Sequence, residues 1–212
     1  MGIFNKSDPQ APKKRYYDAA KVNRLTASWT TTPLSANQIT KSNLVPLVGR
    51  SRELYANNDY SRRFIELLIS NVVGPQGIAM QCTAANPNGL PDQLGNAAVE
   101  IAWKKWGHRK NCDVTGTLGW KSAQSMFIRT VAVDGECFLR LVQNGQDFRI
   151  QFIDSMLVDP MLSDENKGTG NQISQGIEFD SWGRPVAYFV NSTDTADYYS
   201  YNGKKYTRIP AD

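Results

Sequence analysis

The stretch Asn58–Gly77, NDYSRRFIELLISNVVGPQG, combines a start signal, a periodic body and a stop signal for one helix. Asp59 is the predicted N-cap, because its side-chain oxygen can accept hydrogen bonds from the unpaired amides of the first turn. Gly74-Pro75 ends the helix, and residues 77–81 are predicted to form a strand after this turn. Apolar side chains recur at helical spacing on one face, which other elements must cover: Tyr60, Phe64, Leu67, Leu68 and Val72.

The net charge of the chain is concentrated at its N-terminus. The 212 residues carry a formal charge of +4, and residues 1–25 hold six basic and two acidic residues, so the remainder is neutral. We assign residues 1–36 to a basic, mostly extended or disordered arm, which we interpret as a solvated tail. The alternative is electrostatic binding of the arm to nucleic acid or an acidic partner through its basic side chains: Lys13, Lys14, Arg15, Lys21 and Arg24.

The lengths of the apolar runs and the spacing of the cysteines indicate the environment in which the chain folds. The runs are shorter than the roughly 20 residues that cross a bilayer, so we expect a soluble protein, intracellular at synthesis, with no membrane partner. Three cysteines at wide spacings, Cys82, Cys112 and Cys137, favour free thiols over a disulfide framework. His108 and Cys112 have a spacing that metal ligands can use, but no second pair lies nearby. We therefore expect no metal and no cofactor.

Three further segments have helical periodicity. Residues 43–57 are predicted to form a helix with Pro46 in its first turn, with Arg50, Arg52 and Glu53 on its wetter side. A second helix is predicted over residues 92–106 and a third over residues 119–134, where Gly135 ends it.

The remainder of the chain has strand periodicity. Residues 136–142 and 147–153 flank Asn144-Gly145, a strong hairpin signal. Residues 173–179 and 184–191 are predicted to form a second hairpin, and residues 198–209 a third around Asn202-Gly203. We predict an α+β fold over residues 37–212, in which N-terminal helices pack on antiparallel β-hairpins.

Two pairs of carboxylates are the candidates for catalytic or metal chemistry. Asp134 with Glu136 could act as an acid pair, and Asp154 with Asp159 could hold a divalent cation, as nuclease sites do. All lie at bends, so we favour local bonds from their side chains to the backbone. Because His108 is the single histidine and no phosphate-binding loop of the GxxxxGK type is present, we expect no enzyme.

Tryptophans could provide stacking surfaces for single-stranded nucleic acid. Three of them, however, lie within helix faces and the fourth lies in a turn, which favours packing in a core or interface: Trp103, Trp106, Trp120 and Trp182.

The succession of elements from about residue 43 to residue 212 resembles the N-terminal part of a lambda-type bacteriophage portal protein. The segments that carry the resemblance are, in order, NNDYSRRFIELLISNVVGPQGI, AWKKWG followed by CDVTGT, SAQSMFIRTVAVDGECFLRLV, FRIQFIDSMLVDP, and GIEFDSWGRPVAYFV ending in RIPAD. Asp134-Gly135-Glu136, which joins a helix to a strand, is among the most specific of these. No single motif is diagnostic, and the order of the segments carries the resemblance.

The resemblance implies a structural subunit of a homo-oligomeric ring, usually of about twelve copies, at the vertex of a phage head. Its partners would be capsid and scaffold proteins, the terminase packaging motor, head-completion and tail proteins, and double-stranded DNA passing through the ring. Its location would be the virion, and the host cytoplasm during assembly. Because portal proteins are longer than this chain, we expect a wing-like N-terminal fragment without stem or clip. The alternative is a carboxylate-dependent or metal-dependent phosphodiesterase acting on DNA.

Overall fold

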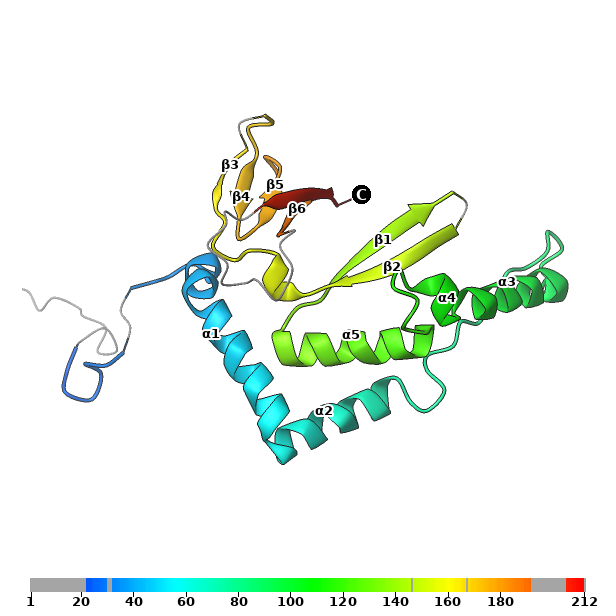
Figure 1. Ribbon diagram of the computed structural model, residues 1–212, viewed down its shortest axis with the longest axis horizontal. Coiled ribbons are helices and arrows are strands. Elements are labelled where there is room, and N and C mark those ends of the chain that lie inside the picture. The colour runs from blue at the N-terminus through cyan, green and yellow to red at the C-terminus, as the bar shows by residue number, and fades with distance from the viewer. Residues whose placement is uncertain (1–21, 30–31, 146, 167, 192–204, 212) are drawn as a thin grey trace, which may run out of the picture.

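The computed structural model describes residues 22–29, 32–145, 147–166, 168–191 and 205–211. These residues form five α-helices and seven strands in an α+β fold, which confirms the predicted class (Figure 1). The helices are α1 (Ala36–Asn57), α2 (Asp59–Val72), α3 (Gln93–Trp106), α4 (Arg109–Cys112) and α5 (Trp120–Asp134). The strands are β1 (Phe138–Asn144), β2 (Asp147–Ile153), β3 (Asp164–Glu165), β4 (Gln172–Ser174), β5 (Ile177–Phe179), β6 (Pro185–Asn191) and β7 (Tyr206–Pro210).

The elements form an elongated arrangement with α5 near its centre. α1 and α2 make a V, and α5 packs against both of them (Figure 1). The hairpin β1–β2 lies along α5, the five-stranded sheet lies at one end, and α3 with α4 lies at the other. In the part of the chain that the structure describes, no helix is long and apolar enough to cross a membrane.

The corner between α1 and α2 is fixed by side chains that satisfy backbone groups. Asn58 is the N-cap of α2, and its side chain accepts from the Ser61 amide at 3.0 Å, whereas Asp59 is the first helical residue. The prediction of Asp59 as cap was therefore wrong by one position. Arg62 reaches back to the carbonyls of Tyr55 and Ala56 at the end of α1, which have no partners within that helix.

α1 begins seven residues earlier than predicted. Ser35 caps it in a reciprocal box with Gln38, whose side chain accepts from the Ser35 amide at 3.0 Å. This Ser-x-x-Gln signal precedes a weakly periodic segment, which is why the sequence pattern did not reveal the start. Pro46 consequently lies inside the helix and not in its first turn.

The buried stripe of α2 is rotated around the helix from the apolar face that the sequence predicted. Ile65 is buried, whereas Phe64 is 63% exposed and Tyr60 is 89% exposed. On α5, Ala123 is buried and Phe127 is 43% exposed. The expectation that the predicted face of α2 is core was wrong, because Leu67 and Val72 are exposed as well, and only Leu68 of that face is half-buried.

Residues 77–81 have no sheet partner, so the predicted strand is absent from this described segment. The side-chain amide of Gln124 on α5 takes the place of a neighbouring strand. It accepts from the Ile78 amide at 2.8 Å and donates to the Ile78 carbonyl at 2.9 Å. The extended segment is therefore held against a helix.

The first predicted hairpin is confirmed. β1 and β2 pair in antiparallel register from Phe138↔Ile153 to Asn144↔Asp147, so Asn144 belongs to the strand and Gly145 (φ 65°) begins the turn. On the side toward α5, Phe148 stacks on Trp106 with ring centroids 4.7 Å apart. Trp106 in turn contacts Trp103 and Trp120, so these three tryptophans pack within the fold as expected, whereas Trp182 is 92% exposed and has no such packing among the described residues.

The second hairpin is larger than predicted. Residues 173–179 form two antiparallel strands, β4 and β5, because Gln175 (φ 54°) and Gly176 (φ 77°) make a tight turn between them. Positive φ at two adjacent residues is the geometry of two-residue hairpin turns, and the non-glycine Gln175 concealed it in the sequence. β6 pairs with β5 and β7, while the predicted turn at Asn202-Gly203 lies outside the described residues.

A buried carboxylate connects the five-stranded sheet. Glu178 is fully buried and accepts from Arg208 Nε at 2.8 Å, from Asn171 Nδ2 at 2.9 Å and from Thr169 Oγ1 at 3.0 Å. The ionic hydrogen bond from Arg208 outweighs the opposing effect of burial and lowers the pKa of Glu178 to about 2. The ionised carboxylate of Glu178 on β5 therefore holds β7 and the β3–β4 loop through hydrogen bonds.

The first prediction concerns the two neighbouring apolar residues of α2. Ile65→Ala is expected to lower the free energy of unfolding by about 2–5 kcal/mol, because it opens a cavity against α5. Phe64→Ala should cost less than about 1 kcal/mol, since most of its ring is already in water. Urea denaturation measures both values, and equal losses would contradict the assigned packing.

The second prediction concerns Glu178. Because its pKa is lower in the folded chain than the ordinary value of 4.5, its contribution to stability is present above pH 4.5 and is lost as the pH falls toward about 2. Glu178→Gln should lower the free energy of unfolding by about 1–3 kcal/mol at neutral pH and flatten this acid dependence. Urea denaturation between these pH values measures it, with the exposed Glu66→Gln as control. Parallel acid curves for native protein and Glu178→Gln would refute the assignment.

Candidate functional site

Three distant parts of the chain meet at the guanidinium of Arg52 on α1. Its Nε donates to Asp134 Oδ1 at 2.8 Å and its Nη2 donates to Asp134 Oδ2 at 2.6 Å, which forms a two-point fork. The same Nη2 donates to Asp154 Oδ1 at 2.8 Å. Ser155 completes the cluster, because its hydroxyl donates to Asp134 Oδ2 at 3.0 Å. Asp134 and Ser155 are buried.

The carboxylates that the sequence analysis grouped in pairs have other partners in the structure. Asp134 shares Arg52 with Asp154 and does not pair with Glu136, so the expectation of local bonds at Asp134 was wrong. Asp154 and Asp159 do make the expected local bonds, to the amides of Met156 and Met161, each at 2.9 Å. Asp159 also accepts from the Tyr206 hydroxyl at 2.6 Å.

This geometry favours a structural clamp over a catalytic centre. Partial burial opposes ionisation of Asp154, but hydrogen bonds from Arg52 and from the Met156 amide outweigh it and lower the pKa of Asp154. A cation bound between Asp134 and Asp154 would have to displace the guanidinium that already neutralises them. The phosphodiesterase alternative gains no support from this arrangement.

The pair His108 and Cys112 does not converge on a common point. Cys112 is buried, and its thiol donates to the Leu118 carbonyl at 3.2 Å, while His108 lies exposed at the start of α4. Burial, together with the adjacent charge of Asp113, raises the pKa of the Cys112 thiol. In the part of the chain that the structure describes, no group of three or more metal-ligating side chains is assembled.

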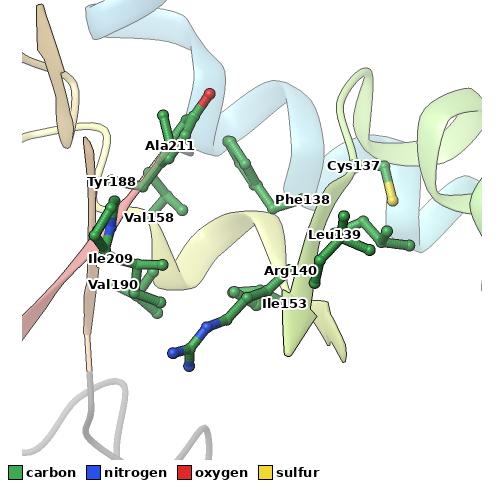
Figure 2. Close-up of a pocket in the computed structure, with 12 residues that line it drawn as sticks. Cys137, Phe138, Leu139, Arg140, Ile153, Val158, Tyr188, Val190, Ile209 and Ala211 are labelled. Carbon is green, nitrogen blue, oxygen red and sulfur yellow. The ribbon is translucent and has the colours of Figure 1, made fainter. Parts of the chain in front are cut away.

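Two hollows flank β1. The first has a volume of about 460 Å³ and lies between the start of β1 and the strands β6 and β7 (Figure 2). Phe138 contacts the edge of the Tyr188 ring here, with centroids 5.7 Å apart, and Ile209 and Val190 add apolar wall. The Arg140 side chain extends away from this apolar group in Figure 2.

The second hollow, of about 410 Å³, lies beneath β1 and is lined almost wholly by apolar side chains of α5, the tryptophan cluster and the hairpin. Leu141 lines both hollows and is 67% exposed. Among the described residues, β1 pairs with β2 alone, so its other edge is open. An open strand edge above an apolar hollow is a surface suited to another protein.

The basic arm is the predicted site that the structure leaves untested. Lys13, Lys14, Arg15 and Lys21 lie outside the described residues, and Arg24 is exposed.

The residue that sequence reasoning missed is Arg52, which was assigned to the wetter side of its helix. Helical periodicity alone gives no signal for a partner 82 residues away.

The third prediction tests the Arg52 clamp. Arg52→Gln should lower the free energy of unfolding by about 2 kcal/mol, less than loss of a fully buried pair costs, because Arg52 is 39% exposed. The same change should raise the pKa of Asp154, as measured by NMR titration. Arg50→Gln, an exposed neighbour on α1, is the control. Equal stability of the two variants would show that the clamp contributes nothing.

Residues 22–212 match the family model described as phage portal protein, lambda family. The chain is also 34% identical over 204 residues to a probable portal protein of Halomonas phage phiHAP-1. The alignment covers 93% of this chain and 39% of that relative, so the chain spans about two fifths of the relative's length. On this similarity, the chain belongs to the lambda family of phage portal proteins.

Proposed function

We propose that the chain is the wing-like part of a structural subunit of a portal ring at the vertex of a phage head. The observation that carries the proposal is family membership over residues 22–212. The geometry of four carboxylates supports a structural role. Arg52 engages Asp134 and Asp154, Tyr206 engages Asp159, and Arg208 engages Glu178. The ring would be a closed, head-to-tail assembly of about twelve copies, and this portion would have no catalytic role.

The proposed assembly defines the partners and the location. Residues 37–212 form the α+β wing-like domain, and residues 1–36 form a basic arm that contacts DNA or an acidic partner. The complete ring admits and releases double-stranded DNA and binds the terminase motor, capsid and scaffold proteins, and head-completion and tail proteins. It assembles in the host cytoplasm and resides in the virion.

The surface around β1 is the best candidate for contact between subunits. In a head-to-tail ring each subunit offers two different surfaces, and each is covered by a neighbour. The hollow beneath β1 provides almost wholly apolar surface, and the open edge of β1 adds unpaired backbone donors and acceptors. Interface cores have this composition, with charged groups at the rim.

The fourth prediction tests this surface. Leu141→Glu should weaken self-association of the chain by tenfold or more, about 1.4 kcal/mol, because it places a charge between the two hollows. Leu94→Glu on α3 is the control, since Leu94 is 87% exposed and belongs to neither hollow. Sedimentation velocity over a range of concentrations measures the association. The proposal is contradicted if native protein and Leu141→Glu have the same mass distribution at every concentration.

A further inference from the structure

A compact group of positive charges occupies the junction of α3 and α4. We define the basic tip as Lys104, Lys105, Arg109 and Lys110, all of which are exposed. No acidic residue lies between residues 101 and 112. Among the described residues, no ion pair joins the basic tip to a carboxylate. Because residues 26–212 have no net charge, the basic tip is a local excess on a neutral body.

The basic tip is carried by a fixed backbone. The Asn111 side chain donates to the Lys105 carbonyl at 2.8 Å and closes the end of α3. The Trp106 indole donates to the Phe148 carbonyl at 2.8 Å and ties the same turn to the hairpin. Asp113 follows directly, but it is 2% exposed and accepts from the Thr117 and Leu118 amides, each at 3.0 Å. Its charge is therefore turned away from the solvent that the tip faces.

The dipole of α3 explains only part of this group. Cations in the last turn of a 14-residue helix are favourable, which accounts for Lys104 and Lys105. Arg109 and Lys110 belong to α4, which has four residues and so a much smaller dipole. Arg109 and Lys110 lie on α4, which Figure 1 shows beside the start of α5 and away from the five-stranded sheet. This placement leaves the charges open to a large anionic partner.

We propose that the basic tip binds the phosphate backbone of duplex DNA. This inference rests on the proposed portal function, and it adds a DNA contact outside the basic arm. The neighbouring rings favour a duplex over a single strand. Trp103 and Trp106 have centroids 4.6 Å apart, and Trp106 also stacks on Phe148, so these faces are already used. Without aromatic faces for unpaired bases, the attraction is electrostatic and independent of sequence.

The fifth prediction uses the full chain and a fluorescent duplex of about 30 base pairs at salt between about 50 and 200 mM. The variant Lys105→Gln with Arg109→Gln should bind about tenfold more weakly in fluorescence anisotropy. Its plot of log affinity against log salt should be shallower by about 2, because two phosphate contacts are removed. The control is Arg50→Gln with Arg63→Gln, which removes the same charge from exposed positions elsewhere and should change affinity less than about twofold.

Further measurements separate the contributions of the basic tip and the basic arm to DNA binding. Replacing Lys13, Lys14, Arg15, Lys21 and Arg24 by Gln measures the contribution of the basic arm. The proposal is overturned if the tip variant keeps native affinity and salt dependence, or if only the arm variant weakens binding. It is also overturned if oligo-dT or polyglutamate binds as tightly as the duplex. Circular dichroism checks folding, and unchanged self-association of the tip variant separates this contact from the portal assignment.

Discussion

The guanidinium of Arg52 is the contact on which the relative placement of helices and strands depends. It joins α1 to Asp134 at the end of α5 and to Asp154 after β2, residues that are 82 and 102 positions away in sequence. A buried carboxylate requires a cationic or hydrogen-bonding partner, so this geometry disfavours movement of α1 away from α5. The hairpin that directly follows Asp134 is thereby held along α5, with one of its faces over the tryptophan cluster.

With the hairpin held along α5, the surface around β1 is not covered by any other element described in the same chain. Leu141 and the open edge of β1 lie between the two hollows, of which the one beneath β1 is almost wholly apolar, and the exposed apolar residues of α2 add further uncovered surface. Monomeric proteins expose contiguous apolar patches of this kind only sparingly. Membership in the portal family supplies the proposed reason: neighbouring subunits in a ring would cover what a single subunit leaves open.

The sequence predicted the elements whose signals are local. The helices after Asn58, Asp92 and Gly119 and the first hairpin were confirmed, because caps, periodicity and turn residues lie within a few positions of one another. Features that depend on distant partners were missed. Residues 77–81 do not form the predicted strand, and the backbone there hydrogen-bonds to the side chain of Gln124. The carboxylate of Asp134 pairs with Arg52 on another helix. Burial within α2 likewise follows the path of α5 and not the apolar pattern alone.

Hydrogen–deuterium exchange before and after assembly of the protein tests whether the surface around β1 becomes an interface between copies. Slower exchange is expected at the β1 amides on assembly, because their open edge and the adjoining hollows lose solvent, while exchange in α3 around Leu94 stays unchanged. Unaltered exchange along β1 in the assembled protein would show that β1 does not lie at such an interface.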